Sequence, residues 1–142
     1  MEQMGAVMGL TVGGNLDRHP GLQVAILEAG GTWLPYWLHR LDEHVEMLRD
    51  VESETGGVTR LPTEAFRAQG WISCEPDEPG LRTLIDWVGA DRILWASDYP
   101  HPDCAYPGMV DHLVAGATSG GLTGEELAGY AGANAARLYR LG

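Results

Sequence analysis

Three short apolar runs, each followed by an amphipathic stretch, constrain the fold of this chain more than any other feature. The runs are rich in β-branched and aromatic side chains and are bounded by turn residues, as buried strands are. We expect strands at 22–27, 71–74 and 92–96. Apolar residues spaced three and four apart predict helices at 33–51, 81–88 and 124–141, with a weaker one at 1–16. This order predicts an α/β fold with parallel strands and right-handed crossovers.

The ends of the expected helices carry local signals. Thr32 is a candidate N-cap, and Pro35 lies in the first turn, where proline is tolerated. The polar stretch 52–69 contains two adjacent glycines and one proline, which predicts a loop with a short helical turn.

An acidic residue follows each predicted strand: Glu28, Glu75 and Asp98. In parallel α/β folds the chemistry lies beyond the carboxyl ends of the strands, so these side chains are expected at one edge. Three carboxylates that crowd together are costly unless a cation or solvent lies among them. The pattern therefore makes a metal site at this edge a candidate.

The charge of the chain excludes several classes of partner. Twenty acidic and nine basic residues give a net charge of −11, which argues against binding nucleic acid or anionic membranes. The sequence contains no lysine, which excludes Schiff-base and phosphate-loop lysines. No apolar run approaches the ~20 residues of a membrane helix, and the N-terminus lacks a basic signal region. The two cysteines have no C-x-x-C spacing, and we expect a cytoplasmic protein.

Three stretches of the sequence resemble the amidohydrolase-related family, in the branch of metal-dependent hydrolases and decarboxylases. Residues 93–103, Ile-Leu-Trp-Ala-Ser-Asp-Tyr-Pro-His-Pro-Asp, are similar to its last strand. Residues 27–37, with 40–44, are similar to its sixth strand and the helix that follows it, and 134–139 to its closing helix. The resemblance covers roughly residues 15–142 and implies part of a TIM (β/α)₈ barrel, strands six to eight with their helices.

The length of the chain limits what this resemblance implies. A complete barrel takes ~250 residues, whereas this sequence has 142. The family's first-strand His-x-His pair does not occur in the sequence, and its fifth-strand histidine would precede Met1. We therefore expect residues 1–142 to form a single partial domain, the C-terminal segment of an amidohydrolase-type barrel, made as a truncated or a separate chain.

The resemblance assigns roles to few residues. Asp98 matches the family's metal-binding aspartate, which also handles a proton in the reaction, so it is a candidate metal ligand and catalytic residue. Glu28 stands where many relatives have a histidine, and it is the second catalytic candidate. Glu75 has no role that carries over. Without the resemblance, Asp98 would be a turn residue in Ser-Asp-Tyr-Pro.

Three further residues are candidates for substrate binding. Trp33 and Tyr99 are aromatic residues at loop positions nearest the expected catalytic face. His101 follows Asp98 by three residues, and its alternative role is to cap or pack within the loop. The pair Gly30-Gly31 after a strand is a weak signal for phosphate binding, because no G-x-G-x-x-G follows it.

The resemblance implies a metal-dependent hydrolase or non-oxidative decarboxylase of a small carboxylated or cyclic substrate, with Zn²⁺ or Mn²⁺ as cofactor. Two alternatives stay open. The chain is a catalytically inactive half-barrel that self-associates or pairs with a missing N-terminal half, because open edges of a parallel sheet invite pairing. Otherwise it is a doubly wound binding module unrelated to the family, which would be a stable monomer without metal.

Overall fold

The structure, a computed structural model, describes residues 1–50 and 58–141. Its sheet has three strands in the order β1-β2-β3. Their bounds are β1 (Val24–Ile26), β2 (Gly70–Ser73) and β3 (Ile93–Leu94). β2 and β3 are parallel, with Ile72 opposite Ile93 and Ser73 opposite Leu94. The predicted α/β fold with parallel strands is confirmed, although β1 and β3 are shorter than their apolar runs and β2 begins one residue earlier than predicted.

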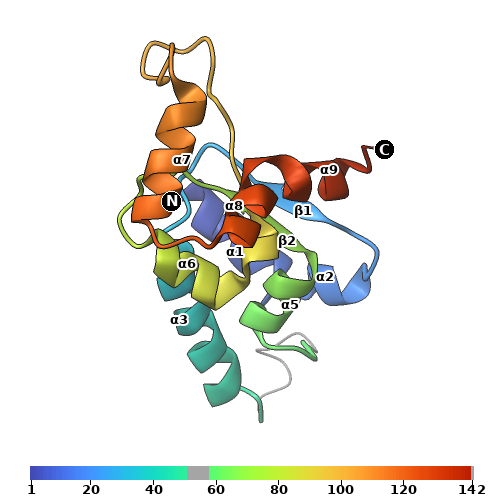
Figure 1. The fold of residues 1–142 in the computed structure, drawn as a ribbon. Coiled ribbons are helices and arrows are strands. Elements are labelled where there is room, and N and C mark those ends of the chain that lie inside the picture. The colour runs from blue at the N-terminus through green and yellow to red at the C-terminus, as the bar shows by residue number, and fades with distance from the viewer. Residues whose placement is uncertain (51–57, 142) are drawn as a thin grey trace. The chain divides into compact units, whose positions relative to one another are not determined.

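Helices separate and follow the strands (Figure 1). They are α1 (Glu2–Leu10), α2 (Asn15–Arg18), α3 (Leu34–Met47), α5 (Pro62–Gln69), α6 (Leu81–Val88), α7 (Met109–Ser119), α8 (Gly124–Ala128) and α9 (Asn134–Tyr139). A 3₁₀ turn, η1 (Ala90–Arg92), precedes β3, and a π-helical segment, η2 (Gly129–Ala133), joins α8 to α9. In the described residues, no helix has the length and apolar character needed to cross a membrane.

Periodicity located the helices better than it located their ends. α6 has the predicted bounds, and Pro35 lies in the first turn of α3. The N-cap of α3 is Trp33 rather than Thr32, so that expectation was wrong. The predicted end of this helix at Val51 and the part of the polar stretch at 52–57 lie outside the described residues.

Glycines divide two of the predicted helices. The N-terminal one is split into α1 and α2 at Gly14, whose φ of 69° lies in the left-handed region. The C-terminal one is interrupted at Gly132, whose φ and ψ are not helical. The end of the polar stretch, by contrast, forms the eight-residue helix α5 rather than a short turn, because Pro62 starts it and Glu64 caps it.

The chain divides into two compact units. The first combines Met1–Ile26 with Trp33–Trp71, and the second combines Leu27–Thr32 with Ile72–Gly142. This division does not test the expected single partial domain, which stays a prediction.

A partly buried polar network stabilises the first unit. The Asp17 carboxylate accepts hydrogen bonds from Thr59 and from the Arg60 Nε atom, the latter at 2.6 Å. Burial opposes ionisation of Asp17, but these hydrogen bonds outweigh it and lower its pKa. Arg60 also donates to Gln69, whose amide donates to the carbonyls of His19 and Leu22. The chain that enters β1 is thus attached to α5.

The core of the second unit lies beside β2 and β3. α6 buries its apolar stripe, formed by Leu81, Leu84, Ile85 and Val88. The hydroxyl of buried Tyr130 donates to the Cys74 carbonyl at 2.5 Å, which attaches η2 to the end of β2. Burial raises the pKa of the Cys74 thiol to about 12, so this cysteine is a buried neutral group.

Candidate active site

The three carboxylates that follow the strands line one small cavity in the second unit. Its volume is about 150 Å³. Glu28, Glu75 and Asp98 line it together with residues of the same three loops, which are Ala29, Gly30, Ser73, Cys74 and Ala96. The expectation that these acidic residues meet at one edge is confirmed by this geometry.

Two of these acidic residues have an unusual backbone conformation. Glu28 has a φ of 58° and Asp98 a φ of 53°, in the left-handed region that non-glycine residues rarely adopt. Such conformations cost about 1–3 kcal/mol each and are concentrated at functional sites. Here they occur at the second residue after β1 and the fourth residue after β3, and both residues line the cavity. Both residues therefore have a structural cost that a functional role would explain.

The glycines after β1 bind an anion, but that anion belongs to the protein. The Gly31 amide donates to both oxygens of the Glu78 carboxylate, at 3.1 and 2.9 Å, and the Thr32 amide donates to one of them at 3.1 Å. Gly30 has a φ of 61°, which glycine adopts without strain. The weak phosphate-binding signal of Gly30-Gly31 therefore corresponds to a carboxylate site that Glu78 occupies.

Gly31 is also required for close packing. A Cβ atom at this position would lie 2.6 Å from Cδ2 of Leu84 and 2.9 Å from Cβ of Cys74, both of which are buried. We expect Gly31→Ala to lower the free energy of unfolding by about 2 kcal/mol, because an overfilled core forces its neighbours to move. Urea denaturation measures this. Gly5→Ala is the control, since its Cβ meets nothing within 4 Å in α1 and should be neutral or slightly stabilising. Equal stability of Gly31→Ala and the wild type would contradict the prediction.

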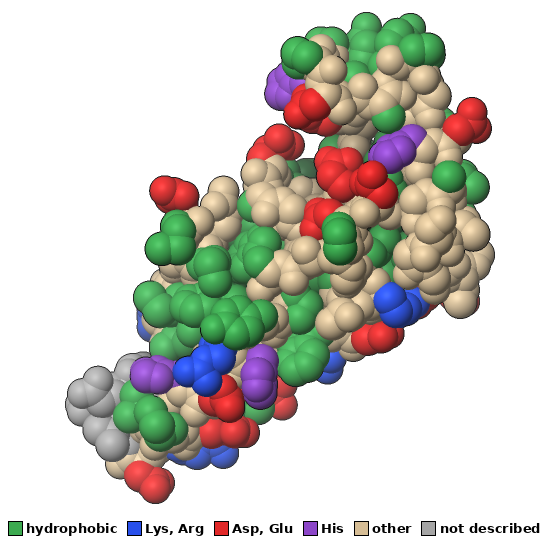
Figure 2. All heavy atoms as spheres, turned by 90° about the vertical axis from the view of Figure 1, so that its left-hand side faces the viewer, with side chains coloured by type: hydrophobic (Ala, Val, Ile, Leu, Met, Phe, Trp, Pro, Cys, Tyr) green, Lys and Arg blue, Asp and Glu red, His purple; other side chains and the backbone are tan. Residues whose placement is uncertain are grey.

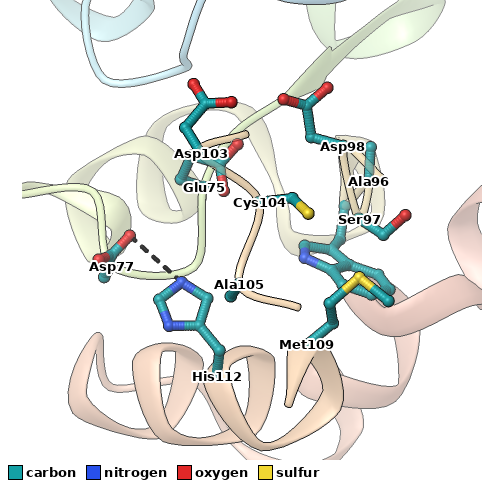
Figure 3. A pocket seen from close by; sticks show the side chains of 11 residues that line it. Glu75, Asp77, Ala96, Ser97, Asp98, Asp103, Cys104, Ala105, Met109 and His112 are labelled. Carbon is teal, nitrogen blue, oxygen red and sulfur yellow. Dashed lines mark ion pairs between the residues drawn. The ribbon is translucent and has the colours of Figure 1, made fainter. Parts of the chain in front are cut away.

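A larger cavity of about 310 Å³ shares Glu75 and Asp98 with the small one (Figure 3). Four carboxylates line it, from Glu75, Asp77, Asp98 and Asp103, together with the imidazole of His112 on α7. Its other lining residues include Trp95, Cys104 and Met109. The cavity thus has an acidic part and an apolar part, and no arginine is among its lining residues.

The electrostatics of this cavity favour a positive charge. Figure 2 shows acidic side chains gathered beside a histidine on one face of the molecule. Burial, and then the neighbouring carboxylates with Asp77 foremost, raise the pKa of Glu75. His112 lies 3.8 Å from Asp77. A bound cation would relieve the repulsion among these carboxylates.

One group of side chains in the described residues has the composition and spacing of a metal site. Asp98, His101 and Asp103 each offer a ligand atom, and these atoms all lie within 4.8 Å of one another. Nδ1 of His101 is 3.1 Å from Oδ1 of Asp98. Carboxylate and imidazole ligands suit Mn²⁺ and Zn²⁺, and three protein ligands leave a position open for catalysis. These residues therefore fit a divalent metal.

The substrate-binding candidates are placed in different ways. Trp33 belongs to the first unit, as the N-cap residue of α3. Tyr99 is 58% exposed and lines neither cavity; its ring packs against Tyr106 with centroids 5.1 Å apart. His101 lies in the group with Asp98. The roles assigned to these residues stay predictions.

Sequence reasoning missed three residues of this region. Asp103 continues the D-x-x-H pattern by two residues, and that spacing was a usable signal. Glu78 and His112 had none, because their partners are set by the folding of loops.

In α/β folds, substrates and cofactors bind beyond the carboxyl ends of parallel strands, and acidic and imidazole side chains lie there in this chain. The family model described as amidohydrolase matches residues 1–141, and the chain belongs to this family. This excludes the unrelated binding module considered from the sequence.

Several known proteins are similar to this chain. The 6-methylsalicylic acid decarboxylase of Penicillium expansum is 31% identical over 97 residues, which are 68% of this chain and 29% of that protein. The crystal structure of 5-carboxyvanillate decarboxylase from Sphingomonas paucimobilis is 27% identical, with a TM-score of 0.69, over 99% of this chain and 40% of that one. The dihydroxybenzoic acid decarboxylase from Polaromonas sp. JS666, with bound manganese and the inhibitor 2-nitroresorcinol, matches in fold at 20% identity. Its TM-score is 0.73, over 97% of this chain and 40% of that one.

The chain therefore spans well under half the length of the relatives it matches. The numbering of its strands as six to eight of a barrel and its cytoplasmic location stay predictions.

Proposed function

We propose that this chain carries the metal site, with Asp98 as its metal-binding aspartate, and the substrate cavity of a metal-dependent, non-oxidative decarboxylase. The observation that carries the proposal is the meeting of Glu28, Glu75 and Asp98 around one cavity in a member of the amidohydrolase family. The names of the similar proteins support decarboxylation of a small aromatic carboxylate. Hydrolysis of a small cyclic substrate, which the sequence resemblance also implied, is the reaction to distinguish from it.

The metal would be held by Asp98, His101 and Asp103. A bound Mn²⁺ or Zn²⁺ would polarise the substrate and offset the negative charge that the surrounding carboxylates impose. The apolar part of the larger cavity, with Trp95 and Met109, is suited to an aromatic ring.

Decarboxylation needs a proton at the ring carbon that carries the carboxylate. That carbon gains the proton, the bond to the carboxylate then breaks, its electron pair returns to the ring, and CO₂ leaves. We assign delivery of the proton to Glu28, which lines the same cavity as Asp98. We assign the transfer of the proton within the site to Asp98 as the group that carries it. Tyr99, on the loop that carries Asp98, is the proposed contact with substrate. His101 is assigned to the metal, so its contact with substrate, like that of Trp33, stays a sequence-based candidate.

The direct test measures metal and turnover in the same sample. The chain is purified by size exclusion, its metal content is determined by elemental analysis, and CO₂ release from ortho-hydroxybenzoates is followed with added Mn²⁺ or Zn²⁺. We expect near-stoichiometric metal and CO₂ release. Lactone hydrolysis without CO₂ release would replace the decarboxylase proposal with a hydrolase. Absence of both metal and turnover would contradict the decarboxylase proposal for this chain.

A second candidate is a non-catalytic half-barrel that self-associates or pairs with a separate N-terminal half. Two observations favour it: the chain spans 29% to 40% of its relatives' lengths, and its sheet has three strands with β1 and β3 at the edges. Parallel sheets are otherwise covered on both faces or closed into barrels. Light scattering tests it: a metal-free oligomer without turnover supports this candidate, and a monodisperse monomer with a cooperative melt contradicts it.

A further inference from the structure

The Glu78 carboxylate is surrounded by backbone donors. It accepts hydrogen bonds from the amides of Gly31 and Thr32 at the distances given above. Its Oε1 atom also accepts one from the Glu75 amide at 2.9 Å. Both oxygens are therefore engaged. Hydrogen bonds from N–H groups to an ionised carboxylate are stronger than neutral ones, so this arrangement is a firm attachment.

The donors come from two loops that are far apart in the sequence. Gly31 and Thr32 follow Glu28 in the loop after β1, and they lie 47 and 46 residues from Glu78, respectively. Glu75 is in the loop after β2. A single side chain thus joins the two loops that carry the strand-end carboxylates Glu28 and Glu75, and both of these line the cavity with Asp98.

Glu78 itself is not a member of the cavity wall. It lines neither the small nor the larger cavity. Because its oxygens accept from backbone amides, it is poorly placed to take a proton from a substrate or to bind an ion. Any effect of Glu78 on the reaction is therefore indirect and acts through the positions of the residues in the two loops that it joins.

We infer that Glu78 is a positioning residue that holds the Glu28 and Glu75 carboxylates at one cavity beside Asp98. The inference rests on the proposed function for its consequence in catalysis, but not for the attachment of the two loops. Glu28 needs this support because its left-handed φ is unfavourable for a residue with a side chain. Without the carboxylate, the amides that follow Glu28 lose their acceptor, and the loop is free to relax away from the cavity.

The test compares Glu78→Ala and Glu78→Gln with the matched control Glu126→Gln. Glu126 also accepts a backbone hydrogen bond, from Thr123 at 2.8 Å, and it accepts from Arg82 Nη1 at 3.0 and 3.1 Å. It lines neither cavity. The control therefore removes a comparable charge and comparable hydrogen bonds at the start of α8.

The first readout is amide hydrogen exchange by NMR, which needs no enzymatic activity. In Glu78→Ala we expect the amides of Gly31, Thr32 and Glu75 to exchange about tenfold faster or more, since each loses its acceptor. Glu78→Gln, which keeps one carbonyl oxygen, should lie between this variant and the wild type. The control should leave these three amides unchanged. Unchanged exchange in Glu78→Ala would overturn the inference.

The second readout is the kinetics of CO₂ release by folded protein, corrected for its metal content. Displacement of groups that position a site typically costs 10- to 100-fold, and we expect kcat to fall by about tenfold or more while KM changes little. The loss should be smaller in Glu78→Gln than in Glu78→Ala. A purely structural role would lower the folded fraction and leave kcat of the folded protein unchanged, which would overturn the inference. Faster exchange in Glu78→Ala, combined with a wild-type protein that shows no turnover, would keep the loop attachment and reject the proposed function instead.

Discussion

Replacement of Asp98 with asparagine is expected to lower kcat for CO₂ release by about 10³-fold, within the 10²- to 10⁴-fold that a group transferring protons contributes. Asparagine preserves the size of the side chain and one oxygen atom, but it carries no charge and cannot hold the transferred proton. It is also a weaker ligand for a divalent cation than a carboxylate. We therefore expect bound metal, measured by elemental analysis, to fall along with the rate.

The control for this substitution is Asp111→Asn, which changes the net charge equally. Asp111 is an exposed residue in the first turn of α7 and lines neither cavity. Its substitution should leave both metal content and kcat close to the wild-type values. Asp98→Asn with a wild-type rate and full metal content would assign Asp98 to the loop as a turn residue, and the catalytic assignment would fall.

The largest expected effect on stability is at Asn134, the first residue of α9. Its side chain is 2% exposed, and its amide donates to the carbonyls of Ala90 and Ile93, both at 2.8 Å. The neighbouring carbonyl, of Leu94, accepts from the Cys74 amide of the chain after β2. Because successive carbonyls of a strand point to opposite sides, that of Ile93 faces away from β2. Asn134 thus donates a hydrogen bond to the Ile93 carbonyl on the edge of β3 that is not paired with β2.

We expect Asn134→Ala to lower the free energy of unfolding by about 3 kcal/mol, because it removes the donor from one buried and one partly buried acceptor and leaves a cavity in the core. Asn134→Asp should be pH-dependent. The ionised carboxyl group would face two carbonyl oxygens, whereas its protonated form can donate to one of them. Its pKa in the folded state would rise above the ordinary value of about 3.9, so stability relative to wild type would fall as pH rises through the folded-state pKa.

Urea denaturation of both variants and the wild type, at several pH values, measures these changes. Asn15→Ala is the control, since the Asn15 amide donates to a single carbonyl, that of Gly9, at 2.7 Å and is only partly buried. It should cost less than Asn134→Ala. Equal losses in the two alanine variants, or an Asn134→Asp variant that is more stable at pH 7 than at pH 4 relative to wild type, would contradict the assignment.

Much of the helical structure could be predicted because burial leaves a local pattern. α6 has the expected bounds since its four apolar residues recur at helical spacing and all are buried. The C-terminal helix shows the limit of this signal. Its apolar residues continue across Gly132, but the backbone leaves the helical conformation there. Periodicity records which side chains are buried, and it does not record a local change of backbone direction.

The candidate site, like the helices, was predictable only in part. Strand order alone predicted that Glu28, Glu75 and Asp98 would meet, because the carboxyl ends of parallel strands share an edge. Only the D-x-x-H spacing, continued by Asp103, indicated that Asp103 could join Asp98 and His101, and this spacing does not determine the approach of their ligand atoms to within 4.8 Å. That approach depends on how the loop after β3 folds back, and many loop conformations are compatible with the same residues.

The sequence by itself determined the alternation of strands and helices, the acidic residue after each strand, and the family to which the Ser97-Asp98-Tyr99 segment points. These features depend on periodicity and short motifs, which are local. Only the tertiary structure decided that the Gly31 amide binds Glu78 and that Asn134 covers the edge of β3. Hydrogen-bond partners separated by more than forty residues are chosen by the packing of whole elements, because many side chains of the same type compete for each backbone group until the fold brings one of them into reach.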